Sequence, residues 1–155
     1  MELKRIQHLT YHDNRGSYTP ISTSQMNMKW DQCSISINTH QFTFRGLHYQ
    51  TNPPQTKYIK VIQGSIIDFA VDLSDNTMDW ILLKDSDAVL VPSNCAHGFL
   101  TLDPNTIVAY LVEGQWDKDS EHSIPYTNHE EVNKIITRVV GDNKVFVSEK
   151  DKLGK

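Results

Sequence analysis

The sequence has few cysteines and no long apolar segment. Its two cysteines, Cys33 and Cys95, stand far apart and form no CxxC pair, which excludes a disulfide framework and a cysteine-based zinc site. No apolar run approaches the roughly 18 residues that span a bilayer, and the first residues contain no apolar stretch of signal-peptide length. We therefore expect a soluble, cytoplasmic protein with no membrane partner.

An excess of positive charge is also lacking. Fifteen lysines and arginines stand against nineteen aspartates and glutamates, a formal net charge of −4, and the basic residues are scattered along the chain. That distribution argues against nucleic acid as the main partner. The length of 155 residues suits one compact domain, residues 1–155, which can bury roughly two-thirds of the surface of its unfolded chain.

Short runs rich in β-branched and aromatic residues follow one another through the middle of the chain. They read CSISIN, FTFRGLHYQ, KYIKVI, SIIDFAVDL, MDWILLK, AVLVP, AHGFLTL and TIVAYLVEG. Many short strands at near-regular spacing predict an all-β fold, a β-sandwich or barrel. Between the runs, Gln63-Gly64 predicts a tight connection of two strands, and Asp103-Pro104-Asn105 predicts a hairpin loop.

One later segment departs from the strand pattern. In NHEEVNKIITRVVG the apolar residues recur at helical spacing, Asn128 is placed to cap, and Gly141 is placed to end the helix. We predict one short amphipathic helix near residues 129–140, packed outside the β core. Beyond it, KVFVSEK predicts a brief strand, and the last residues are expected to be loose.

Two of the seven histidines lie inside predicted strands. His48 lies in RGLHYQ and His97 in PSNCAHGF, so both can point into a barrel interior. Histidine is the side chain best suited to move protons near neutral pH. Taken alone, a histidine in such a strand is more often a hydrogen-bonded structural residue than a catalyst.

The spacing from Pro92 to His97 matches the second conserved element of cupin barrels, and RGLHYQ falls where the first element lies. Metal-binding cupins have a second histidine and a glutamate in that first element, where this chain has Gln50 and Gln55. Amide oxygens bind divalent transition metals poorly beside imidazole. A metal-dependent cupin is therefore disfavoured, and we predict no metal site.

Arg45 lies in the middle of an otherwise apolar and aromatic strand. If buried it needs an anionic partner, and a ligand phosphate suits its planar guanidinium. Strict alternation places Arg45 and His48 on opposite faces of the strand. If both serve one site, a bulge or twist at Gly46 must bring them together.

The motifs DNRG, RGLHYQ, Gln55-Thr56-Lys57, IIDFAVDL, VPSNCAHGFLTL and SEKD occur in this order. The ordered set strongly resembles dTDP-4-dehydrorhamnose 3,5-epimerases, cofactor-independent cupin enzymes of rhamnose biosynthesis. The match runs over roughly residues 13–126 and again at 148–151. The resemblance implies a cupin-type jelly roll, no cofactor and a homodimer in which an N-terminal segment or strand completes the neighbour's site.

Site residues follow from the resemblance, position by position. His48 matches the general base, Asp151 the carboxylate that orients it, Tyr110 the proton donor, and Lys57 the lysine that stabilises negative charge on O4 of the sugar. The matches to substrate-binding positions are Arg15, Arg45, Gln50, His97, Trp116, Glu121 and Lys150. Pro20 replaces a substrate-binding glutamate, and the stretch before RGLH departs from the family pattern, so the nucleotide is not specified.

The resemblance implies an epimerase that inverts C3 and C5 of a nucleoside-diphosphate 4-keto-6-deoxy sugar, most simply dTDP-4-dehydro-6-deoxyglucose. Four alternatives stay open. They are inversion at one carbon only, 3,4-ketone migration, a sugar-nucleotide-binding module without catalysis, and the disfavoured metal-dependent cupin.

Overall fold

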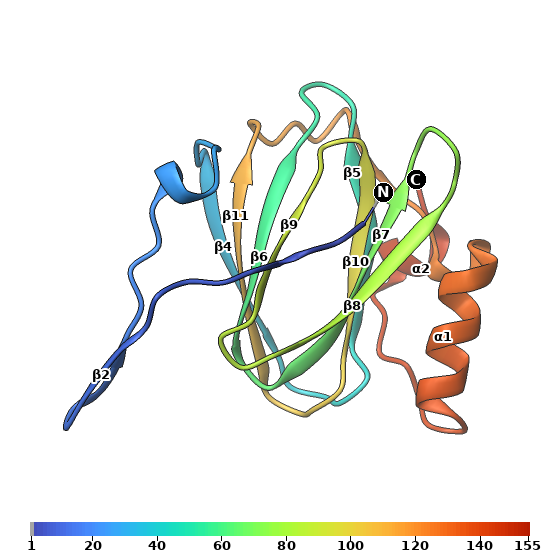
Figure 1. Cartoon of the computed structure of the whole chain (residues 1–155). Helices are drawn as coiled ribbons and strands as arrows, with labels where there is room; N and C mark the ends of the chain where they lie inside the picture. Colours follow the sequence, from blue (N-terminus) through green and yellow to red (C-terminus); the bar gives the residue numbers. More distant parts are fainter. Residues whose placement is uncertain (1) are drawn as a thin grey trace.

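The structure, a computed structural model, describes residues 2–155 and contains two five-stranded antiparallel sheets packed face to face (Figure 1). Sheet 1 contains, in spatial order, β1 (Arg5–Ile6), β9 (Ala88–Val91), β6 (Thr56–Gln63), β11 (Thr106–Glu113) and β4 (Gln32–Asn38). Sheet 2 contains β12 (Glu121–Ser123), β5 (Phe44–Gln50), β10 (Cys95–Thr101), β7 (Ser65–Asp72) and β8 (Met78–Lys84). The predicted all-β sandwich is confirmed.

The chain crosses between the two sheets at tight connections. Gly64 alone separates β6 of sheet 1 from β7 of sheet 2, with φ +88°, and a Cβ there would lie 2.4 Å from Oγ1 of Thr106. The predicted hairpin at residues 103–105 is wrong, because β10 pairs with β5 and β7 whereas β11 pairs with β4 and β6. Turn residues show where a chain reverses, but not which sheet the next strand joins.

Sheet 2 is covered over most of both faces, although Trp80 of β8 is 48% exposed. Its inner face packs on sheet 1, and its outer face packs on α1 (Glu130–Val140) through residues such as Phe69, Leu100 and Ile136. The predicted helix is therefore confirmed, and Gly141 ends it with φ +60°. His129, not Asn128, caps the helix by accepting a hydrogen bond from the backbone of Val132.

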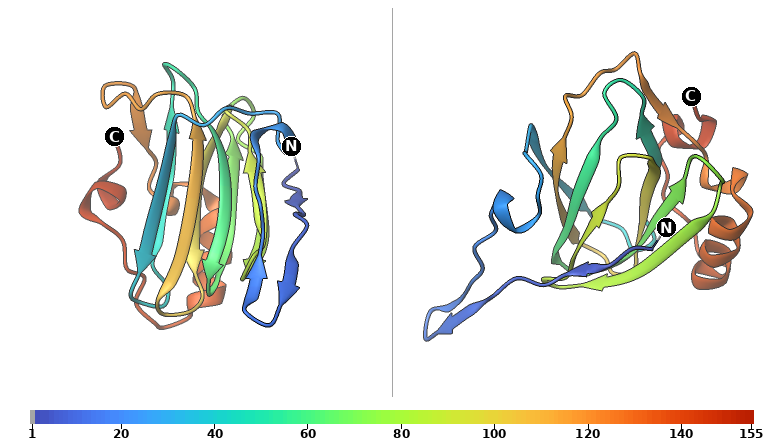
Figure 2. Two further views of the ribbon diagram at one scale, coloured as in Figure 1. Left: turned by 90° about the vertical axis from the view of Figure 1, so that its left-hand side faces the viewer. Right: turned by 45° about the horizontal axis from the view of Figure 1, so that its top comes forward.

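The outer face of sheet 1 is covered only in part. The N-terminal segment, with the 3₁₀ turn η1 (Thr23–Gln25), packs Met26 and Met28 over Tyr58 and Leu111. Farther along β4, Ile35 and Ile37 are 67% and 66% exposed. The hairpin of β2 (Tyr11–Asp13) and β3 (Gly16–Tyr18) projects away from the sandwich (Figure 2), and all six of its strand residues are exposed.

The C-terminal segment differs from the prediction. After η2 (Tyr126–Asn128) and α1, the predicted strand in KVFVSEK is reduced to an isolated bridge between Thr43 and Phe146. The expected loose end is a helix, α2 (Glu149–Leu153), because the Ser148 hydroxyl caps it by accepting from the backbone N–H of Asp151 at 3.2 Å. Lys155 then donates a backbone hydrogen bond to Ser123 at 2.8 Å.

Neither α1 nor α2, the two α-helices among residues 2–155, is long and apolar enough to pass through a bilayer.

The packing of α1 on sheet 2 gives a stability prediction. Ile136 is 1% exposed within the outer core, so Ile136→Ala leaves a cavity and lowers the free energy of unfolding by about 2–5 kcal/mol. Denaturant unfolding monitored by circular dichroism measures the loss. Thr137→Ala, at the next and exposed position of α1, is the control and changes stability by about 0.5 kcal/mol or less. Equal effects of both substitutions would contradict the packing described.

Candidate active site

A bulge in β5 places two polar side chains on the same side of sheet 2. Gly98 of β10 faces two residues of β5, Gly46 and Leu47, where the register shifts. Gly46 has φ +134°, and a Cβ there would lie 2.5 Å from Cα of Gly98, so only glycine fits. Arg45 and His48 consequently line one cavity, whereas Leu47 points into the core beneath α1. The bulge at Gly46 that a shared site for Arg45 and His48 requires is present.

His48 is paired with a carboxylate from the end of the chain. Its Nε2 lies 2.6 Å from Oδ1 of Asp151, which is 5% exposed. Asp151 also accepts hydrogen bonds from the backbone N–H of Gly46 at 3.1 Å and the hydroxyl of Ser123 at 3.1 Å. With Nε2 donating to the carboxylate, Nδ1 of His48 is the acceptor.

The environment of Asp151 keeps this carboxylate charged. Burial alone would raise its pKa, but the hydrogen bonds from His48, Gly46 and Ser123 and the charge of His48 hold the pKa below its ordinary value. The capped helix α2 fixes the position of the residue. The pair therefore has a defined orientation and a defined tautomer of His48.

A second histidine–carboxylate pair lies deeper in sheet 2. Nε2 of His97 is 2.7 Å from Oδ1 of Asp68, whose side chain is fully buried. Within residues 2–155, the other oxygen of Asp68 has no hydrogen-bond partner. Asp68 was not predicted from the sequence as a site residue. The available signal was an acidic residue in the middle of the apolar strand SIIDFAVD, where a buried charge needs a partner.

Seven of the predicted site residues line one cavity of about 300 Å³ between the sheets. They are Arg45, His48, Lys57, His97, Tyr110, Lys150 and Asp151. Apolar side chains such as Ile59, Phe99 and Val112 form the remaining wall. We name this space the central cavity.

Lys57 and Tyr110 extend into the central cavity from neighbouring strands of sheet 1. Burial lowers the pKa of Lys57 to about 8, against the opposing charges of Glu121 and Asp68. The side-chain ammonium of Lys57 forms no hydrogen bond or ion pair with residues 2–155. Burial raises the pKa of Tyr110, while a hydrogen bond from Ser36 and the charge of Arg45 act in the opposite direction. Near neutral pH, Lys57 is thus a cation with no ion-pair partner in residues 2–155. Tyr110 is a neutral phenol at the same pH.

Trp116 and Glu121 lie at the rim of this site. The carboxylate of Glu121 accepts hydrogen bonds from the indole N–H of Trp116 and from Nζ of Lys150. Trp116 is 56% exposed, and neither Trp116 nor Glu121 lines the central cavity. Their connection to it runs through Lys150, a lining residue.

Gln50 and Arg15, like Trp116 and Glu121, do not line the central cavity. The buried amide of Gln50 donates to the carbonyls of Pro53 and Gln115 and accepts from the backbone of Asp117. Those bonds hold two loops together, which is a structural role. Arg15 lies in the β2–β3 hairpin, where its side chain is 86% exposed and pairs with Asp13.

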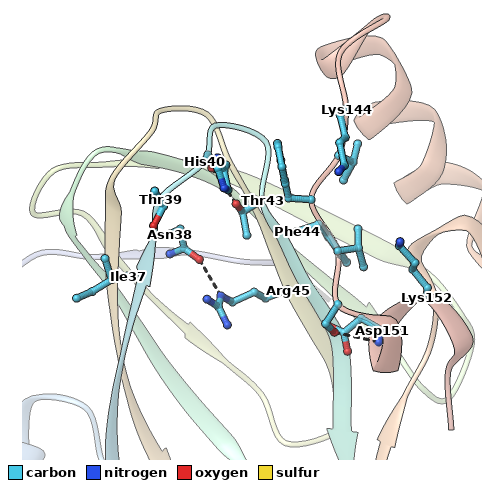
Figure 3. A pocket seen from close by; sticks show the side chains of 14 residues that line it. Ile37, Asn38, Thr39, His40, Thr43, Phe44, Arg45, Lys144, Asp151 and Lys152 are labelled. Carbon is cyan, nitrogen blue, oxygen red and sulfur yellow. Dashed lines mark hydrogen bonds between the residues drawn. The ribbon is translucent and has the colours of Figure 1, made fainter.

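A second cavity adjoins the first. It has a volume of about 430 Å³ and lies between the adjacent ends of β4 and β5 and the segment 144–152 (Figure 3). Arg45, Ser148 and Asp151 line both spaces. We name it the lateral cavity. Within residues 2–155, no three His, Cys, Asp or Glu side chains gather in a group that could hold a metal ion.

Comparisons with curated proteins give several dTDP-4-dehydrorhamnose epimerases. The Mycobacterium tuberculosis dTDP-4-dehydrorhamnose 3,5-epimerase is 36% identical over 104 residues, 62% of this chain and 50% of that protein. The Methanothermobacter thermautotrophicus protein of that name is 35% identical over 115 residues, 70% of this chain and 61% of that protein. A dTDP-4-dehydrorhamnose 3-epimerase of Streptomyces niveus is 29% identical over 101 residues, 60% and 48% of the two chains. The chain therefore spans about half to three-fifths of these relatives.

Solved structures of the same fold match this chain over most of its length and most of their own. The Bacillus anthracis dTDP-4-dehydrorhamnose 3,5-epimerase, solved with TDP and PPi, has a TM-score of 0.83 and 28% identity, covering 97% of this chain and 91% of that one. The Legionella pneumophila enzyme, solved with dTDP-4-keto-L-rhamnose, has a TM-score of 0.82 and 26% identity, covering 99% and 86%. The family model described as dTDP-4-dehydrorhamnose 3,5-epimerase matches residues 2–155. The chain belongs to the dTDP-4-dehydrorhamnose 3,5-epimerase family.

Proposed function

We propose that this chain inverts C3 and C5 of dTDP-4-dehydro-6-deoxy-D-glucose and so forms dTDP-4-dehydro-L-rhamnose. The observation that carries the proposal is the grouping of His48, paired with Asp151, with Tyr110 and Lys57 around one cavity. This set contains a base, an acid and a cation, which is what carbon epimerisation beside a ketone requires.

The chemistry follows from the ketone at C4. Removing a proton from C3 or C5 leaves an enolate whose negative charge is on O4. In the proposed reaction, Nδ1 of His48 accepts that proton, and the charge of Asp151 stabilises the imidazolium that forms. A positioned base of this kind contributes roughly 10²–10⁴ to the rate.

The enolate needs a positive charge at O4. Lys57 has no acceptor of its own in residues 2–155 and is proposed to donate to O4, where charge develops only as the carbon–hydrogen bond breaks. His97 is held by Asp68 and is proposed to contact the same part of the sugar. Both groups thereby stabilise the transition state more than the bound ketone.

Tyr110 is proposed to return a proton to the opposite face of the enolate. Each inversion then leaves His48 protonated and Tyr110 ionised. Both groups must exchange protons with solvent before they can act again, so hydrogen from water enters the product at each inverted carbon.

We propose that the protein acts as a homodimer. The β2–β3 hairpin extends away from its own sandwich, so it can carry Arg15 towards the site of a second copy (Figure 2). The exposed Ile35 and Ile37 on the outer face of sheet 1 provide apolar surface for such pairing. The cytoplasmic location expected from the sequence stays a prediction.

Solvent exchange tests the proposed reaction. In deuterated water the wild-type protein should place deuterium at C3 and C5 of the dTDP-linked keto sugar, because the returned proton comes from solvent. His48→Ala should abolish this incorporation. Proton NMR of the sugar follows both positions separately.

The same measurement separates the alternatives. Deuterium at one carbon selects the one-carbon epimerase, the activity named for the Streptomyces niveus relative, and a moved carbonyl selects ketone migration. Binding without exchange selects the non-catalytic module, and activity that tracks metal content selects the metal-dependent cupin. No incorporation with dTDP-, GDP-, CDP- or UDP-linked 4-keto sugars would rule out the proposed function.

The proposed proton donor has its own test. Tyr110→Phe keeps the ring and removes the acidic hydroxyl, so kcat should fall by roughly 10²–10⁴. Tyr126→Phe is a matched control, because Tyr126 packs against Phe44 in the outer core, away from the central cavity, and it should leave kcat unchanged. A Tyr110→Phe protein with wild-type kcat would assign the protonation step to another group.

Lys57 predicts an alkaline limit. Its pKa is lowered to about 8, so the cation is present below that pH and is lost as pH rises through it. The value of kcat/KM should therefore fall above about pH 8. Lys57→Arg keeps the charge at all working pH values, so the fall in kcat/KM should move to higher pH. A fall in kcat/KM at the same pH in both proteins would show that Lys57 is not the titrating group.

A further inference from the structure

Asn38 is a buried polar residue to which neither the family resemblance nor the proposed reaction gives a role. It is the last residue of β4, points between the sheets and is 1% exposed. Its Nδ2 donates to Oγ of Ser36 at 3.2 Å and to the carbonyl oxygen of Thr106 at 3.0 Å. Its Oδ1 accepts from Nε of Arg45 at 2.7 Å. Both N–H donors of the amide and one of the two acceptor positions of its oxygen are therefore occupied.

These partners define the orientation of the amide. A carbonyl oxygen can only accept and an arginine Nε–H can only donate, so Nδ2 must face Thr106 and Oδ1 must face Arg45. The contact joins the two sheets, because Asn38 belongs to sheet 1 and Arg45 to sheet 2. Figure 3 shows the Arg45 side chain reaching from β5 across to Asn38 on β4.

The bond to Nε restrains the guanidinium without neutralising it. Among residues 2–155, the guanidinium of Arg45 forms no other hydrogen bond and no ion pair, which leaves its four remaining N–H donors free. Arg45 lines both the central and the lateral cavity, and its charge partly offsets the rise in the pKa of Tyr110 that burial causes. A free cation is thus held at the junction of the two spaces.

A neutral amide suits this arrangement better than a carboxylate. An aspartate beside Nε would form an ion pair with Arg45 and compete with any anionic ligand. A long, unrestrained arginine, by contrast, loses rotamer entropy each time it binds. Asparagine fixes the side chain before the ligand arrives and leaves the charge available.

We propose that Asn38 is a positioning residue that holds the guanidinium of Arg45 ready for the diphosphate of the substrate. The proposal rests on the proposed function for the nature of the anion. It adds a residue that acts on binding through Arg45 and does not itself touch the reacting sugar carbons.

A double-mutant cycle tests this role by dTDP binding, measured by titration calorimetry. Asn38→Ala should weaken dTDP binding about tenfold, since the Nε bond to a charged group is lost and the guanidinium is released. In an Arg45→Ala protein the same substitution should have no further effect. Asn128→Ala, at an exposed position before α1, is the control and should leave binding unchanged.

The cycle separates positioning from general damage. Loss of the bonds to Ser36 and Thr106 has the same effect in the wild-type protein and in the Arg45→Ala protein. Thermal unfolding of all four proteins of the cycle measures this loss of stability. Unchanged dTDP binding in Asn38→Ala, or an equal loss with and without Arg45, would overturn the proposal, as would a wild-type protein that binds neither dTDP nor GDP, CDP or UDP. Because binding needs no turnover, dTDP binding without deuterium exchange would reject the proposed reaction and leave this inference standing.

Discussion

The close approach of β5 and β10 at Gly46 and Gly98 is the constraint on which the site depends. The two backbones come so near that a side chain on Gly46 would overlap Cα of Gly98. The extra residue that this contact accommodates reverses the alternation of β5. Leu47 then joins the core under α1, while Arg45 and His48 face the central cavity together. A regular strand would send one of these two polar groups into that apolar core.

The remaining groups reach the cavity by different routes. Lys57 and Tyr110 come from paired strands of sheet 1, whose regular alternation directs both inwards. Asp151 comes from α2, more than a hundred residues along the chain from His48. The rigid sheets thus position the base, the acid and the cation, and a short capped helix supplies the carboxylate that orients the base.

Much of this arrangement could be predicted from sequence because it depends on local patterns. Strand alternation, the helix at residues 130–140 and the requirement for a bulge at Gly46 all follow from periodicity and residue type. The sheet assignment of β10 and β11 could not be predicted, because pairing is decided by distant strands. The roles of Asp68 and Asn38 were not predicted for a similar reason, because each depends on a hydrogen bond to a residue of another strand. The helix α2 was missed although its Ser148 cap is a local signal.

The distance in sequence between His48 and Asp151 also bears on how the site comes into being. Synthesis proceeds from the N-terminus, so every strand of both sheets is made before residues 149–153. His48 therefore gains its carboxylate only after α2 has been made and has docked beside Ser123. A prematurely terminated product lacking α2 keeps every strand of both sheets but has no counter-charge for its base.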